Sequence, residues 1–430
     1  MEAFLSYFIY FTIVVVFNII EYKRCRTVIN PFFFLSIPFT IIMLICVAFN
    51  KAMYFVPFNP LCLNLWSVGL VIFWIGGATC EIIIKKAFPE SGVCDEKRSL
   101  YAGVNDKSLI NIIFGICILF SMLLTLKSGS SGDFASKEMG DEVGKGGIAG
   151  RISNVLILAV PYYFGYKCKP LKRIGVILLL MMLITAIGSK TWLTYSLVAG
   201  FVTMGFTGMK INPKTIIIGG LVLLLVFVLY YRLNTGIEDN DHFMEFVARH
   251  FYFYITSGIL PLSEIIDKNM EFHGTGMTHP FVKLFMSWID PSSFSFHSKL
   301  WITTDLFLGT QSNVCTFFGN FYTSGGMKYV ITNSFYSGLL CYFFRVLYLR
   351  SNSIFLASSY ALTLAVLFFG WFNYGLGLER IWEIYIISFI LYYLSKYKFS
   401  IYGQSYGSIF RKFHSKSNSR NRFVSLNNEK

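Results

Sequence analysis

Long apolar runs separated by short polar clusters dominate this chain. A helix needs about 20 residues to cross the roughly 30 Å of bilayer hydrocarbon. Backbone groups there must bond within their own segment, and the alternating ten-residue pattern of a β-barrel is missing, so we expect helices. The pattern predicts an all-α polytopic membrane protein with about 11 transmembrane helices: 3–20, 31–49, 61–84, 109–126, 152–166, 174–188, 191–208, 215–231, 328–344, 354–372 and 380–395.

One long segment interrupts the series of short connections. Residues 232–327 hold five of the six histidines and nine carboxylates. Their apolar, aromatic stretches at 242–266 and 281–289 predict short helices at the outer leaflet, with Pro261 and Pro280 as breaks. The chain is therefore expected to divide into four parts: spans in 1–231, a large loop at 232–327, spans in 328–395 and a basic tail at 396–430.

The composition excludes several classes of protein. Only 14% of the 430 residues are charged and 55% are apolar, whereas soluble chains average about 25% charged residues. A soluble enzyme, a nucleic-acid binder and a disordered scaffold are excluded. The nine cysteines are scattered through apolar runs without a CxxC pair, so we expect packing residues and no disulfide framework. The first run has no cleavage site after it and is expected to be a retained span.

The basic residues are distributed unevenly between alternate connections. One set of connections, with the tail, holds 24 of the 37 basic residues and has a net charge of +17, against −3 for the other set. By the positive-inside rule, the first set is cytoplasmic. The sequence therefore predicts a cytoplasmic C-terminus, a periplasmic N-terminus and a periplasmic large loop.

Five cations are expected on the outer side, where the charge bias disfavours them. Lys190 and Arg380 lie at outer ends of spans, and Arg151, Arg232 and Arg249 open or close outer segments. Each alone is typical of a snorkelling anchor or a surface ion pair. Together they predict a site for an anionic headgroup, since guanidinium groups grip phosphate oxygens in a bidentate manner and can stabilise a departing diphosphate.

His250 is the first candidate for a general base, because the neighbouring cation Arg249 favours neutral imidazole. Metal catalysis has little support: HExxH is missing, and the acidic run at 238–241 is typical of a solvated face. We therefore expect neither a metal nor another cofactor.

Three stretches resemble the Wzy-type O-antigen polymerases, the oligosaccharide repeat-unit polymerases. GTQSNVCTFFGNFYTSGGMKYVI (309–331) is similar to that family's S/T-N-V-Y-T-x-x-G-x-x-Y, which precedes a glycine turn and a span, although Cys315 replaces the usual Tyr. GSK (188–190) resembles a Gly-Ser-Arg, with Lys190 in the Arg position. RHFYFYITSG (249–258) resembles an Arg followed by a Tyr-rich stretch.

The resemblance implies a membrane-embedded, inverting C-type glycosyltransferase. It would transfer a glycan from undecaprenyl diphosphate to the non-reducing end of a fresh lipid-linked repeat unit, at the periplasmic face of the bacterial inner membrane. A flippase and a chain-length regulator of the same pathway would be its partners, besides membrane lipids. The implied catalytic residues are His250, Arg249, Arg380 and Lys190, and the implied substrate-binding residues are Arg151, Arg232, Asn313, Tyr322 and Tyr254.

Two other functions fit the same pattern of spans. A transporter, such as the flippase for the lipid-linked unit, usually shows repeated halves with short loops; the odd span count and single large loop disfavour it. An O-antigen ligase would share the architecture and the donor and differ only in its acceptor, so the sequence does not separate it from a polymerase.

Overall fold

The computed structural model describes most of the chain. The described residues are 2–87, 107–130, 148–166, 169–186, 190–209, 225, 228, 232, 239–270, 301–351 and 353–396. The predicted span at 215–231, apart from residues 225 and 228, the stretch at 281–289, Pro280 and the basic tail after Lys396 lie outside this described part.

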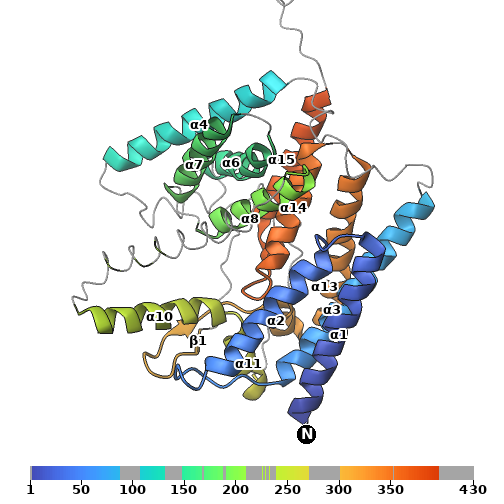
Figure 1. The fold of residues 1–430 in the computed structure, drawn as a ribbon, viewed down its shortest axis with the longest axis vertical. Coiled ribbons are helices and arrows are strands. Elements are labelled where there is room, and N and C mark those ends of the chain that lie inside the picture. The colour runs from blue at the N-terminus through green and yellow to red at the C-terminus, as the bar shows by residue number, and fades with distance from the viewer. Residues whose placement is uncertain are drawn as a thin grey trace, which may run out of the picture.

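Ten of the predicted spans coincide with helices (Figure 1). They are α1 (Glu2–Cys25), α2 (Pro31–Phe49), α3 (Leu61–Ala87), α4 (Lys107–Ser130), α6 (Ile148–Gly165), α7 (Pro170–Ala186), α8 (Lys190–Phe206), α13 (Phe317–Arg350), α14 (Ile354–Phe368) and α15 (Glu379–Lys396). In the described residues four of them, α1, α2, α3 and α13, are long and apolar enough to cross a membrane. The fold is that of a mostly α-helical membrane protein.

Close packing of α3 against α13 forms one half of the structure. A Cβ on Gly76 would collide with the carbonyl oxygen of Phe335, and one on Gly338 with that of Phe73. Only glycine lets the two backbones approach this closely, as in small-residue interfaces of membrane helices. α1 packs beside them and leaves large apolar side chains such as Phe4 exposed, as expected for a lipid-facing helix.

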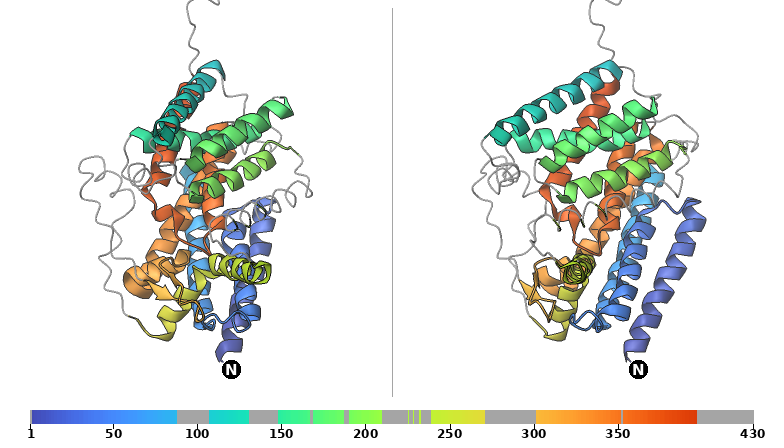
Figure 2. Two further views of the ribbon diagram at one scale, coloured as in Figure 1. Left: turned by 90° about the vertical axis from the view of Figure 1, so that its left-hand side faces the viewer. Right: turned by 60° about the vertical axis from the view of Figure 1, so that its left-hand side comes forward.

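The second half consists of α4, α6, α7 and α8, which cross the first group at a steep angle (Figures 1 and 2). α14 joins the two halves: it packs on α2 and α13 on one side and on α6 and α8 on the other. Residues 354–367 are all buried, and the helix is capped by Ser353, whose side chain accepts a bond from the Phe355 amide. α14 is therefore the centre of the core.

The large loop contains the two short helices expected near 242–266. They are α10 (Asn240–Thr256) and α11 (Ile259–Asp267). The predicted break at Pro261 is wrong: the chain turns at Ser257 and Gly258, and Pro261 is a buried residue in the first turn of α11. Proline is tolerated there because the first-turn amides have no intrahelical partner. A Cβ on Gly258 would collide with the backbone of Trp371 and Phe372, so glycine is required at the turn.

A small hairpin follows, with β1 (Ile302–Thr303) antiparallel to β2 (Gln311–Ser312). Helix α13 begins at Phe317, inside the predicted large loop, with Thr316 as its N-cap. The helix breaks at Gly325 and Gly326, the latter with φ +67°. The span predicted at 328–344 is the part after this break, so the expected glycine turn before a span is confirmed.

The helix ends in the described residues gather in two groups. The ends of α1, α8 and α13 meet the start of α14: the Tyr360 hydroxyl donates to the Ile29 carbonyl, and Phe206 stacks on Tyr348 and Tyr360. At the opposite end, residues 50–59 contact α10, α11 and the hairpin. We call the first group the inner end and the second the outer end, after the sides that the charge pattern predicts.

Candidate functional site

Arg380 lies at the outer end of the second half, in the first turn of α15. Its Nε donates to Asn154 Oδ1 and its Nη2 to Ser153 Oγ, both on α6. The guanidinium also lies 5.3 Å from the ring centroid of Trp192 on α8. Both oxygen acceptors are neutral, so the positive charge of Arg380 is held in place by three helices without being neutralised by its direct partners.

Glu383, one turn further along α15, completes this network. Its Oε2 accepts a bond of 2.5 Å from the Asn154 amide. Asn154 thereby joins the cation of Arg380 to a carboxylate, and it fixes both side chains relative to α6. We call Ser153, Asn154, Trp192, Arg380 and Glu383 the Arg380 cluster.

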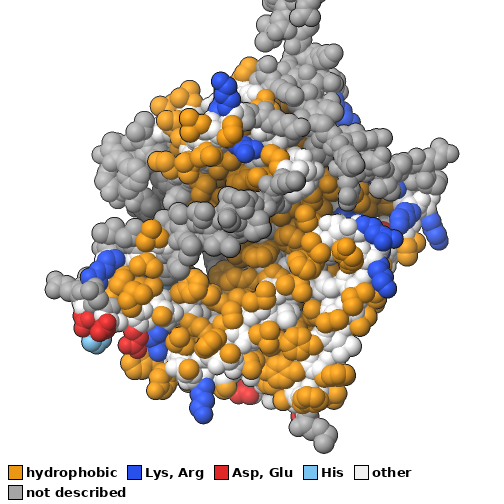
Figure 3. Space-filling model, viewed as in Figure 1, with side chains coloured by type: hydrophobic (Ala, Val, Ile, Leu, Met, Phe, Trp, Pro, Cys, Tyr) orange, Lys and Arg blue, Asp and Glu red, His pale blue; other side chains and the backbone are white. Residues whose placement is uncertain are grey.

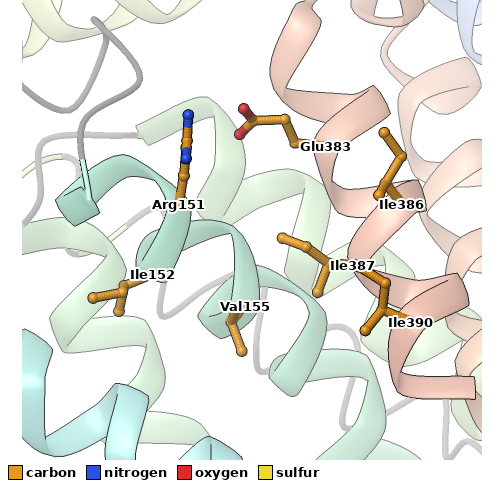
Figure 4. Close-up of a pocket in the computed structure, with 7 residues that line it drawn as sticks. All are labelled: Arg151, Ile152, Val155, Glu383, Ile386, Ile387 and Ile390. Carbon is orange, nitrogen blue, oxygen red and sulfur yellow. The ribbon is translucent and has the colours of Figure 1, made fainter. Parts of the chain in front are cut away.

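A groove of about 400 Å³ opens beside this cluster, between α6 and α15 (Figure 4). Arg151 and Glu383 face each other at its mouth, and Ile386, Ile387 and Ile390 line α15 beyond them. Ile390 lies seven residues after Glu383 on α15, or about 10 Å further along the axis. The groove thus combines a charged mouth with an aliphatic wall, the pattern that an amphiphile with an anionic head would fit.

Arg249, the buried cation of the large loop, lies at the outer end of the first half. Its Nη2 is 2.6 Å from Asp305 Oδ1, and both side chains are buried. The rings of Phe307 and Phe55 cover the guanidinium, with centroids 4.7 and 5.7 Å away. Arg249 therefore ties α10 to the hairpin, where its charge is already matched by a carboxylate.

His250 points away from this pair into an aromatic environment. Its ring stacks on Phe246 with centroids 5.2 Å apart and meets Tyr254 edge-on at 5.2 Å. Burial lowers the pKa of His250 below its usual 6.5 because the charged form is poorly solvated. The cause of this lower pKa is burial and not, as expected, the charge of Arg249.

The other predicted residues divide between the two halves. The Arg232 guanidinium lies 4.8 Å from the Phe243 ring, beside α10. Lys190 begins α8, two residues before Trp192, so its backbone lies on the same side of the molecule as Arg380. The structure does not describe its side chain. Asn313 and Tyr322 are partly buried near the start of α13. Arg151 lines the groove between α6 and α15 and Arg380 lies beside it, whereas Arg249 and Arg232 accompany α10.

The segment 369–378 runs between the two groups. The Phe317 amide donates to the Gly370 carbonyl at 2.6 Å, and the backbone of Trp371 and Phe372 packs on Gly258. Further along, the Tyr195 hydroxyl donates to Asn373 Oδ1 at 2.9 Å. One connection therefore links the motif at 309–331 and the α10–α11 turn to α8 and the Arg380 cluster.

A network at the inner end was missed by the sequence reasoning. Arg24 pairs with Glu21 at 2.5 Å and with Glu81 at 3.5 Å, while Arg345 pairs with Glu81. Glu81 lies inside the run 61–84, and a carboxylate within a predicted span is the signal that could have found it. Among the described residues, no three His, Cys, Asp or Glu side chains gather as metal ligands would.

The fold is that of a mostly α-helical membrane protein with polar clusters at both ends of its helices. Residues 54–401 match a family described as "Family of unknown function (DUF6337)". The match covers most of the chain, which therefore belongs to this family. No curated protein and no solved structure matches it.

Proposed function

We propose that the protein is a glycosyltransferase that polymerises lipid-linked oligosaccharide repeat units. The observation that carries the proposal is the groove between α6 and α15, with Arg151 and Glu383 at its mouth, the rest of the Arg380 cluster beside it and isoleucines along its wall. A polyisoprenyl diphosphate has the matching chemistry, an anionic head on an aliphatic chain. The resemblance of 188–190, 249–258 and 309–331 to Wzy-type polymerases supports the same substrate class.

In this proposal the growing glycan on undecaprenyl diphosphate is the donor. A hydroxyl of the fresh repeat unit attacks the anomeric carbon, the bond to the diphosphate breaks with inversion, and a base takes the hydroxyl proton. Arg380 and Arg151 stabilise the negative charge that develops on the leaving diphosphate. The aliphatic chain lies along Ile386, Ile387 and Ile390.

The proposed setting is the bacterial inner membrane, with eleven spans, the outer end in the periplasm and the C-terminus in the cytoplasm. The excess of Lys and Arg on the opposite connections supports this orientation. The fresh repeat units would come from a flippase, and a chain-length regulator would act as partner.

Deleting the gene and running a gel of surface polysaccharide tests the proposal against its alternatives. Loss of a polymerase leaves single capped repeat units. Loss of a ligase leaves polymer on the carrier lipid, and loss of a flippase yields neither, so either pattern would refute polymerisation.

Substitutions in the groove test the assignment of residues. We expect Arg380→Ala and Arg151→Ala to remove long glycan chains while the protein still inserts in the membrane. Arg380→Lys should restore them only in part, because lysine keeps the charge but loses the planar fork. Lys169→Ala, which removes an exposed cation between α6 and α7, is the control and should keep normal chains; wild-type polymer from Arg380→Ala and Arg151→Ala together would refute the diphosphate site.

A further inference from the structure

The tip of the hairpin exposes an unusual run of large apolar side chains. Leu306, Phe307 and Leu308 are 62, 67 and 52% exposed, and Tyr54 beside them is 65% exposed. The stretch 301–312 contains a single charged residue, Asp305, which is buried. A water-exposed turn normally carries polar residues, so three consecutive large apolar ones indicate a surface that another apolar phase covers.

The tip is held rigidly in this exposed position. Asp305 Oδ1 accepts bonds from the Phe307 and Leu308 amides, at 2.9 and 3.1 Å. The Leu306 amide donates to the Tyr54 carbonyl at 3.0 Å, and Gly309 closes the turn with φ +66°. The buried pair of Arg249 with Asp305 anchors the whole turn to α10. These hydrogen bonds and this ion pair therefore hold the apolar side chains in their exposed positions.

The position of the tip identifies what covers it. Tyr54 follows the outer end of α2, and the hairpin lies within the length of the lipid-facing helix α1, towards its N-terminal end (Figures 1 and 2). Hydrophobic side chains continue across this face over α2 and α1, with few charges between them (Figure 3). Lys51, three residues before Tyr54, is exposed and can meet lipid phosphates at the boundary.

From this placement we infer that the tip formed by Leu306, Phe307 and Leu308, with Tyr54, inserts into the outer leaflet of the membrane. The occupant is the upper acyl region of phospholipids. A glycan is disfavoured because a sugar site needs hydrogen-bonding side chains beside its aromatic platform, and the Leu-Phe-Leu-Gly turn has none. The insertion would fix α10 and the hairpin at the bilayer surface, whichever reaction the protein performs.

Photocrosslinking in vesicles tests this inference directly. Benzoylphenylalanine replaces Phe307 in the full-length protein, which is reconstituted in vesicles of phosphatidylethanolamine and phosphatidylglycerol, irradiated and analysed by mass spectrometry. The same label at Phe8, an exposed residue of α1, is the positive control, and the label at His242, an exposed polar position of the same loop, is the negative control. We expect lipid adducts at positions 307 and 8 and none at 242. Adducts at 8 without any at 307, or a crosslink from 307 to a second protein chain, would overturn the inference.

Thiol labelling gives an independent measurement in case the crosslinker disturbs the fold. We expect a membrane-impermeant maleimide to modify Phe307→Cys at least about tenfold more slowly than His242→Cys, because thiol modification needs a thiolate in water. The parent chain measures the background from native cysteines. Equal rates for the two variants would place the tip in water and refute insertion.

Discussion

Two histidines of α10 have opposite environments although they lie only two turns apart. His250 is half-buried among aromatic rings, which lowers its pKa below 6.5, whereas His242 is exposed and 2.7 Å from Asp239, which raises its pKa above 6.5. On acidification the unfolded chain therefore takes up a proton at position 250 before the folded one. The folded state loses stability from this site as the pH falls below about 6.5. The contribution of His242 has the opposite sign: it is fully present below about 6.5 and disappears as the pH rises through the pKa of the folded state.

We predict that His242 titrates at a higher pH than His250. Nuclear magnetic resonance of protein labelled at its six histidines can follow both rings, with His242→Gln and His250→Gln assigning the signals. A midpoint for His250 at or above that of His242 would contradict the placement of these rings.

Individual residues are the hardest part to predict from sequence. Charge and position in the sequence make Arg249 and Arg380 equally good candidates for binding a diphosphate. The sequence does not show that Asp305, 56 residues from Arg249, neutralises the charge of Arg249. Nor does it show that the acceptors of Arg380 are the neutral Ser153 and Asn154. Such partners depend on contacts between distant segments, which a pattern along the chain does not contain.

At the scale of elements, helix packing depends on a few glycines. Gly338 and Gly76 lie where α3 and α13 approach most closely, and a side chain there would meet the opposite backbone. Gly115 on α4 and Gly175 on α7 have open space around the same position.

We predict that Gly338→Ala and Gly76→Ala lower the thermal unfolding temperature of the purified protein. Overpacking against a rigid backbone costs roughly 1–3 kcal/mol. The matched substitutions Gly115→Ala and Gly175→Ala should be neutral or stabilising, since alanine in an open helix position gains roughly 0.5–1 kcal/mol over glycine. If all four variants unfolded alike, the close contact of α3 with α13 would be wrong.

The elements themselves follow largely from the apolar pattern. Ten spans coincide with helices because about twenty apolar residues in a row leave the backbone little choice but helix. The sequence prediction fails where a single residue has two structural meanings. Proline at 261 predicts a break in a helix, but the first turn of α11 accommodates it. The helical start of α13 before Gly325 is not evident from sequence because the stretch 317–324 is too short and too polar to be recognised as part of a span.

At the scale of the whole molecule, the charge pattern predicts which connections meet. The side predicted to be basic contains Arg24, Arg345 and Arg350, and the structure brings their helix ends together: Arg24 and Arg345 share Glu81, and Arg350 donates to the Ile84 carbonyl. The same logic does not predict the steep crossing of α4, α6, α7 and α8, because hydropathy reports how long a helix is and not how far it tilts.

Because α6 and α7 cross the other helices at a steep angle, the connection between them decides whether this part of the chain spans the membrane. Lys169, exposed between α6 and α7, is cytoplasmic only if α6 crosses the membrane, whereas Lys51, exposed after α2, belongs to the outer end. We predict that a membrane-impermeant maleimide labels Lys51→Cys in intact cells and labels Lys169→Cys only after permeabilisation, with the parent chain giving the background. Labelling of both in intact cells would mean that α6 and α7 return to the outer side without crossing, and the groove beside α15 would then open at the membrane surface instead of extending into the bilayer.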